Sequence, residues 1–124
     1  MGTVCALTGF TMRQCMQEEV SQRMVREILR EGISVAQAMD LPIPTEYLEK
    51  AMDYLSQGGD HKPSILMDIE NHRETENEYH CGKIFHYAEK YGIEVPVNQT
   101  LYYLLQCLEK NPSRKIKKKE TVNA

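Results

Sequence analysis

The sequence predicts an all-α fold of about five helices. Apolar residues recur at the three- and four-residue intervals of an amphipathic helix, and Pro and Gly residues fall between these periodic segments. No segment alternates apolar and polar residues for long enough to form a sheet. A chain of 124 residues with 41% hydrophobic residues can close one modest core. We therefore expect a single helical domain over residues 1–111.

The first expected element is one long helix over about residues 12–40, a stretch without Pro and with one Gly. Apolar residues recur every four positions at Met16, Val20, Met24 and Ile28, and further apolar residues lie beside them: Val25, Leu29, Val35 and Ala36. The helix must end before the LPIP motif at 41–44, because each Pro moves the preceding residue out of helical geometry.

Two shorter helices are expected after these prolines. Thr45 can cap a helix that runs to Gln57, where Gly58 and Gly59 stop it. A turn then brings Ser64 to the start of a helix of about two turns. Ser64 has an ordinary interpretation as the N-cap of that helix.

The last two expected helices carry the clearest capping and periodicity signals. Thr75 and Glu78 have the T-x-x-E spacing of a capping box, which predicts a helix from Thr75 to a stop at Gly92. The final helix ends at Asn111–Pro112, and its apolar residues follow the i, i+3, i+4, i+7 pattern: Leu101, Leu104, Leu105 and Leu108.

Charge divides the chain into an acidic body and a basic tail, residues 112–124. Five of the 15 basic residues lie within 114–119, so the rest of the chain carries 10 basic against 18 acidic residues, a formal charge of −8. An acidic body does not fit a nucleic-acid groove, and no segment reaches membrane-spanning length. We expect a flexible tail and neither a nucleic-acid nor a membrane partner.

Cysteine spacing and the absence of phosphate-binding motifs indicate a cytoplasmic protein without a cofactor site of its own. The four cysteines show no CxxC spacing and no export signal precedes them, so we expect free thiols: Cys5, Cys15, Cys81 and Cys107. Cys81 and Cys107 are not expected at helix N-termini and should pack as small hydrophobic residues. Neither GxGxxG nor GxxxxGK[ST] occurs, so no dinucleotide should bind tightly to this chain alone.

The segment RETENEYHCGK, residues 73–83, concentrates the polar residues that could carry chemistry. Glu76 and His80 are i and i+4 on the expected helix, but a second pair of ligands is missing and we predict no metal site. Glu76 would lie in the first helical turn, where its charge complements the helix dipole. It can therefore be read as a structural residue or as an ionised carboxylate that holds a cation or a hydroxyl group.

A longer stretch gives this segment a context. Residues 62–98, KPSILMDIENHRETENEYHCGKIFHYAEKYGIEVPVN, resemble the C-terminal domain of ketopantoate reductase, also called 2-dehydropantoate 2-reductase. ALTGFT, residues 6–11, resembles the turn between that domain's first two helices, and the resemblance covers residues 2–110. The positions that match the family pattern are Ser64, Asp68, Arg73, Thr75, Glu76, Gly82, Gly92, Ile93, Pro96 and Asn98.

The resemblance implies a helical domain like the C-terminal domain of 6-phosphogluconate dehydrogenase. It implies a two-domain enzyme that uses NADPH to reduce the ketone of 2-dehydropantoate in pantothenate biosynthesis. Ser64 matches the substrate-contacting serine, and Glu76 matches the active-site glutamate near the catalytic lysine. That lysine would precede Met1, and Lys62 does not align with it, so we expect no turnover by this chain alone.

The sequence departs from the family pattern at three places, which leaves the keto-acid substrate open. Asn77–Glu78 replace the usual Ile-Asp, Cys81 replaces the usual Asn, and a substrate-contacting asparagine that falls near Gly2 is not matched. Whether this chain belongs to an active enzyme is therefore uncertain. The alternative is a non-catalytic helical interaction or dimerisation module derived from such a reductase, and a homodimer is possible in either case.

Overall fold

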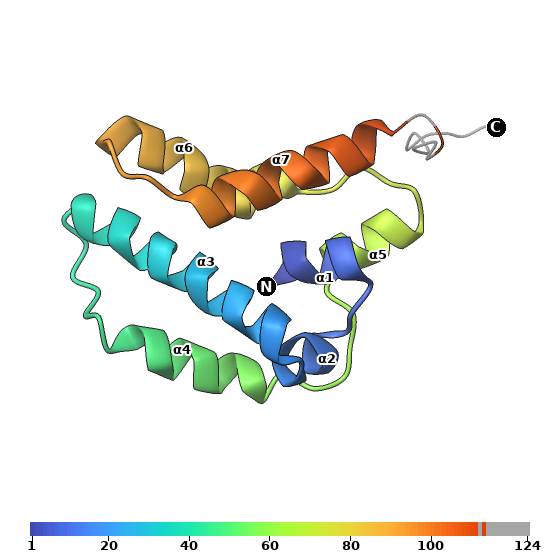
Figure 1. Ribbon diagram of the computed structural model, residues 1–124, viewed down its shortest axis with the longest axis horizontal. Helices are drawn as coiled ribbons and strands as arrows, with labels where there is room; N and C mark the ends of the chain where they lie inside the picture. The colour runs from blue at the N-terminus through green and yellow to red at the C-terminus, as the bar shows by residue number, and fades with distance from the viewer. Residues whose placement is uncertain (112, 114–124) are drawn as a thin grey trace.

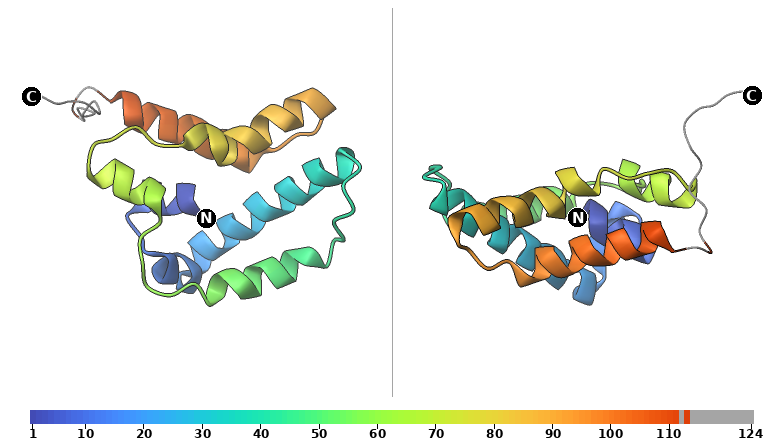
Figure 2. Two further views of the ribbon diagram at one scale, coloured as in Figure 1. Left: turned by 180° about the vertical axis from the view of Figure 1, so that it is seen from behind. Right: turned by 90° about the horizontal axis from the view of Figure 1, so that it is seen from above.

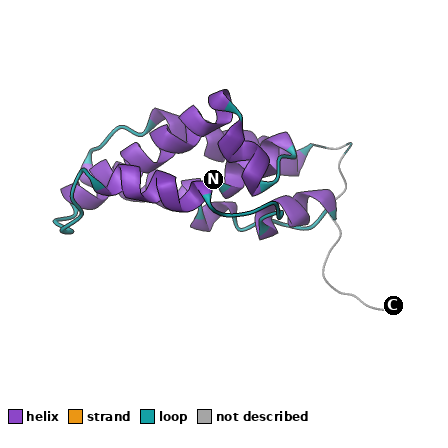
Figure 3. Ribbon diagram, turned by 90° about the horizontal axis from the view of Figure 1, so that it is seen from below, coloured by secondary structure: helices purple, strands orange, loops and turns teal. Residues whose placement is uncertain are grey.

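The computed structural model describes residues 1–111 and Ser113, and every regular element within them is a helix (Figures 1 and 3). The elements are α1 (Gly2–Thr8), α2 (Met12–Gln17), α3 (Glu19–Ala38), α4 (Tyr47–Ser56), α5 (Ser64–Glu70), the 3-10 helix η1 (Asn77–Tyr79), α6 (Cys81–Tyr91) and α7 (Pro96–Lys110). The all-α prediction is confirmed. Apart from Ser113, the expected basic tail lies outside the described residues.

The helices form two layers, and three short helices, α1, α2 and α5, close one end (Figure 1). α6 and α7 lie side by side in one layer, and α3 and α4 form the other (Figures 1 and 2). α1 packs against α5 and α7, while α3 also contacts α6 and α7. Because α7 contacts α1, α3, α6 and η1, it connects the closed end to the rest of the molecule.

One main core runs through the molecule, and all seven α-helices or the residues that cap them contribute to it. Its most buried members include Val4 in α1, Cys15 in α2 and Val25 in α3. A smaller cluster joins α1, α5 and α7 through Ala6, Ile65 and Leu105. Periodicity did not predict α1, and only the resemblance implied a helix before residues 6–11; α1 contributes to both clusters.

The predicted long helix is wrong at one residue, because α2 and α3 are separated by a break at Glu18. Glu18 has extended backbone angles, φ −80° and ψ 125°. The Ser21 hydroxyl donates to the Cys15 carbonyl at 2.6 Å, which satisfies an acceptor at the end of α2. Val20, expected on the apolar face, is 64% exposed.

Several predicted helix boundaries are confirmed and two predicted caps are wrong. Gly92 ends α6 in the left-handed conformation, φ 70°, as its position indicated. Thr45 does not cap α4, whose N-cap is Glu46. Ser64 is the first helical residue of α5 rather than its N-cap, which is Pro63.

Candidate functional site

The segment that precedes α6 is held by α7 and not by a local capping box. The Thr75 hydroxyl donates to Glu109 Oε1 at 2.7 Å, and the Tyr102 hydroxyl donates to Glu78 Oε2 at 2.8 Å. The predicted helix start at Thr75 is wrong, because α6 begins at Cys81. Both side chains of the expected capping box, those of Thr75 and Glu78, are hydrogen-bonded to residues of α7 instead.

Glu76 lies within this segment as an exposed residue at the N-terminus of η1. Its backbone has φ −93° and ψ 41°, and its carbonyl accepts a hydrogen bond from the Tyr79 N–H at 2.9 Å. Within the described residues its carboxylate makes no hydrogen bond or ion pair. The helix-dipole explanation is wrong as well, because the 3-residue η1 provides no substantial macrodipole.

Ser64 is also exposed, and its hydroxyl forms no hydrogen bond to the described part of the chain. The turn before it is fixed from two sides. The Met12 N–H donates to the His61 carbonyl at 2.9 Å, and the Lys62 ammonium group pairs with Glu70 at 2.9 Å. The turn before Ser64 is therefore fixed in place, while the Ser64 hydroxyl group makes no hydrogen bond within the described residues.

The segments that carry Ser64 and Glu76 meet at the start of α1. A Cβ atom added at Gly2 would lie 3.0 Å from Ile65 Cγ2, next to Ser64, and 3.6 Å from the His80 ring. Burial lowers the pKa of His80, and the nearby charge of Glu76 opposes that shift. Ile65, next to Ser64, and His80, four residues after Glu76, thus both lie beside the start of α1.

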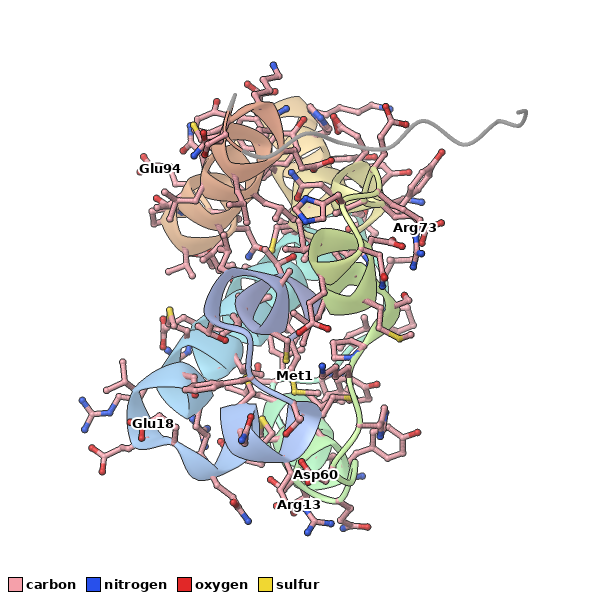
Figure 4. The ribbon with its side chains drawn as sticks, turned by 90° about the vertical axis from the view of Figure 1, so that its right-hand side faces the viewer. Met1, Arg13, Glu18, Asp60, Arg73 and Glu94 are labelled. Atoms are coloured by element: carbon pink, nitrogen blue, oxygen red, sulfur yellow. The ribbon has the colours of Figure 1, made fainter. Side chains whose placement is uncertain are left out.

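The turn between α5 and this segment has its own internal support. The Arg73 N–H donates to the Asp68 carbonyl at 2.8 Å, and the Arg73 side chain donates to the Asp68 carboxylate at 3.1 Å. His72 between them adopts the left-handed conformation with φ 56°. Arg73 lies at the edge of the molecule in Figure 4. Asp68 and Arg73 therefore have a structural role in forming the turn.

Metal and thiol chemistry find little support at this site. In the described part of the chain no group of three or more side chains could hold a metal ion. Glu76 and His80 do not share a helix face, because α6 begins after both. Cys81 is the first residue of α6, against expectation, but burial raises the pKa of its thiol. Cys107, expected to be buried, is exposed.

A pocket of about 330 Å³ lies beside this segment, between η1 and α7. It is lined by Glu74, Thr75, Asn77, Glu78, Gln106, Glu109 and Lys110. Three carboxylates face one ammonium group there, so an anionic keto acid would be repelled. Ser64 and Glu76 do not line this pocket, and we do not assign the candidate site to it.

Solved structures of dehydrogenases and reductases contain this fold. The chain matches a D-mandelate dehydrogenase solved with NADH and anilino(oxo)acetate at a TM-score of 0.83, 25% identity, and 93% coverage of this chain and 65% of that chain. It matches the dimeric ketopantoate reductase of Staphylococcus aureus at a TM-score of 0.80 and 25% identity, covering 89% of this chain and 39% of that chain.

Sequence comparison narrows this class to one family. The 2-dehydropantoate 2-reductase of Streptococcus pyogenes is 31% identical over 111 residues, which cover 88% of this chain and 36% of the relative. That of Pyrobaculum aerophilum is 27% identical over 89 residues, covering 72% and 32%. The chain belongs to the family "Ketopantoate reductase PanE/ApbA C terminal", whose model matches residues 1–109.

The family assignment confirms the predicted resemblance, and the coverage shows that this chain corresponds to only part of its relatives. The chain spans about a third of the length of the curated relatives it matches, 36% for the Streptococcus pyogenes enzyme. None of the described helices is both long and apolar enough to span a membrane.

The sequence did not indicate two carboxylates that hold other segments in place. Glu109 bonds the segment before α6, 34 residues away, and Glu31 bonds the start of α7, 66–67 residues away. Partners so far apart in the sequence leave no local pattern.

Proposed function

We propose that this chain forms the substrate-closing half of an NADPH-dependent 2-dehydropantoate 2-reductase, with Ser64 as a substrate contact and Glu76 as an active-site carboxylate. The observation that carries the proposal is the exposed, unbonded carboxylate of Glu76 at the position that matches the family's glutamate. Thr75 and Asn77, on either side of it, are both bonded to α7. A free acid on a fixed backbone is suited to a ligand or a catalytic partner.

The cofactor would have to be held by another domain. The described residues form no strand, and the chain has no glycine-rich phosphate loop, so they do not fit a dinucleotide. In a complete reductase the nicotinamide would supply a hydride to the ketone carbon. The chain described here supplies groups that position the substrate and stabilise charge.

Glu76 and Ser64 can act on different groups at the reaction centre: Glu76 on the catalytic lysine and Ser64 on the substrate. A carboxylate placed beside the ammonium group of a lysine stabilises that group, which protonates the oxygen as negative charge develops on it. Ser64 can donate or accept a hydrogen bond and so orient the keto acid. Both functions need the catalytic lysine, which the resemblance assigns to the first helix of the helical domain and which this chain lacks, and the cleft that the cofactor domain completes, so the chain alone should show no turnover.

The test is a spectrophotometric assay of NADPH oxidation with 2-dehydropantoate. The purified chain should be inactive, and joining it in frame to the N-terminal part of the Streptococcus pyogenes reductase should give activity. In that two-domain enzyme Glu76→Gln should lower kcat/KM by about 10²- to 10⁴-fold. Ser64→Ala should raise KM by about tenfold, the equivalent of one hydrogen bond. Turnover by the chain alone would refute the predicted inactivity.

Two matched controls separate these effects from general damage. Glu94→Gln removes a charge from an exposed residue that lies on the opposite edge of the molecule from Arg73 in Figure 4. Ser34→Ala removes a hydroxyl group from an exposed position in α3. Both should retain full activity. Equal losses in Glu94→Gln and Glu76→Gln would refute the role proposed for Glu76.

Self-association is a second candidate function, favoured by exposed apolar side chains on α7. Tyr103 is 45% exposed and Leu104, expected on the apolar face, is 50% exposed. The similar Staphylococcus aureus reductase is described as dimeric. A homodimer that buries this face should dissociate when Leu104 is changed to Glu, as measured by sedimentation velocity. A monomeric wild-type chain at high concentration would refute it.

A further inference from the structure

A single carboxylate on α7 accepts hydrogen bonds from both donors of Thr75, its hydroxyl group and its backbone N–H. The Thr75 hydroxyl donates to Glu109 Oε1 at 2.7 Å, and the Thr75 backbone N–H donates to Glu109 Oε2 at 3.2 Å. Thr75 Oγ1 in turn accepts the Asn77 N–H at 3.3 Å. Glu109, Thr75 and Asn77 therefore form a continuous chain of hydrogen bonds across Glu76.

A second bond to the same helix fixes the far side of Glu76. Asn77 is 4% exposed, and its side-chain Nδ2 donates to the Tyr102 carbonyl at 3.0 Å. Positions 102 and 109 are seven residues apart, so they lie on one face of α7. One helix face thus holds both neighbours of Glu76, and the backbone of Glu76 has little freedom to move.

We propose that Glu109 is a positioning residue for Glu76: its carboxylate fixes Thr75 and so determines where the Glu76 carboxylate lies in the substrate cleft. This inference rests on the proposed reductase function. Glu109 touches neither substrate nor cofactor in this proposal. It acts through Thr75, and the misplacement of a reacting or charge-stabilising group by about 1 Å can lower a rate by about 100-fold.

The position of Glu109 within α7 argues against a role in helix stability. α7 ends at Lys110, so Glu109 lies in the last turn. A negative charge there opposes the helix macrodipole, and Ala or Gln at this position would suit the helix itself better. The contact with Thr75 is the favourable interaction that this side chain makes in the described residues.

The kinetic test uses the two-domain enzyme described above. Glu109→Ala should lower kcat by about 10- to 100-fold with KM changed less than about threefold, because substrate contacts such as Ser64 remain. Glu109→Gln keeps one acceptor oxygen and should recover part of the loss. Glu89→Ala, an exposed glutamate near the end of α6, is the matched control and should retain full activity.

A double mutant separates positioning from a merely structural role. If Glu109 acts through Glu76, adding Glu109→Ala to Glu76→Gln should cause little further loss of kcat, less than about twofold. Independent, multiplicative losses would overturn the proposal. An unchanged kcat in Glu109→Ala, or an equal loss in Glu89→Ala, would also overturn it.

Amide hydrogen exchange tests the anchoring without any catalytic readout. In the chain alone, Glu109→Ala should speed exchange at the Thr75 and Asn77 amides and leave α3 unchanged. If Glu109→Ala does not fold, Thr75→Val is measured in its place, because it removes the same hydroxyl contact. Unchanged exchange overturns the proposal. Inactivity of the wild-type two-domain enzyme would instead refute the proposed function, while the exchange result would still decide the anchoring.

Discussion

The N-terminus of α7 is capped by Glu31, a residue of α3 that lies more than 60 positions earlier in the chain. Its carboxylate accepts the N–H groups of Val97 and Asn98, each at 2.9 Å, and the Asn98 side-chain amide at 2.8 Å. Asn98 is fully buried, with 0% exposure. We predict that Glu31→Ala destabilises the protein more than any exposed Glu→Ala change in α3.

The magnitude follows from the bonds that the substitution removes. Loss of an N-cap costs about 1 kcal/mol, and loss of a charged partner by a buried amide costs about 1–3 kcal/mol. Asn98 Nδ2 would keep one bond, to the Ile28 carbonyl at 3.3 Å. The free energy of unfolding should therefore fall by about 2–4 kcal/mol, which lowers Tm by roughly 8–16 °C for a domain of this size.

The assay is urea unfolding followed by far-UV circular dichroism, with Tm measured separately by calorimetry. Glu27→Ala is the matched control, because Glu27 lies one turn earlier on α3 and makes a half-exposed ion pair with Arg30. It should change stability by less than about 0.5 kcal/mol. Glu31→Gln keeps one acceptor oxygen and should fall between the two. Equal effects of Glu31→Ala and Glu27→Ala would refute the reasoning.

Four further predictions concern two glycine positions, tyrosine ionisation and thiol reactivity. Gly82→Ala should destabilise the protein by about 1–3 kcal/mol in urea unfolding, because the new Cβ would lie 2.7 Å from Tyr102 Cε1 and 2.9 Å from a backbone oxygen. Gly32→Ala, whose Cβ would meet only a side-chain methyl group at 3.5 Å, should stabilise by up to about 1 kcal/mol. The hydrogen bond to Glu78 raises the pKa of Tyr102 to about 12, so stability from this group should be lost as pH rises from about 10 to about 12. Absorbance titration at about 295 nm should show a late tyrosine that Tyr102→Phe removes, and an unchanged titration would contradict this. Cys107 should react with Ellman's reagent in the folded state, unlike the three buried cysteines, and Cys107→Ser should abolish the fast phase.

Periodicity and stop signals predicted the helical class and several boundaries, since those signals are local. Gly92 ends α6 as expected, because the backbone restriction acts at the residue itself. α7 begins at Pro96, earlier than the expected start after Asn98, because Pro is well suited to the first helical position. The break at Glu18 has no such signal. It is stabilised by Ser21, which bonds the carbonyl of Cys15, and a serine at that spacing predicts nothing by itself.

The start of α6 shows how tertiary partners override a local motif. The T-x-x-E spacing of Thr75 and Glu78 is a sound capping signal when the two residues have no other partners. Here Glu109 and Tyr102 bond to them from α7, and a charge-assisted bond to a carboxylate is stronger than a neutral cap. No local spacing predicts a bond to Glu109 or Tyr102, which lie 34 and 24 residues further along the chain.

The same contacts separate the residues of the family pattern that have a structural partner from those that have none. Gly82 is explained by the close approach of Tyr102, and Asn98 by its buried bonds to Glu31. Asp68 and Arg73 form a turn together, and Thr75 is bound to Glu109, as described above. Ser64 and Glu76 are exposed, and no hydrogen bond in the described residues uses their side chains. A matched polar residue without a structural partner has the strongest claim to a ligand, and that reasoning directs the first substitutions to these two positions.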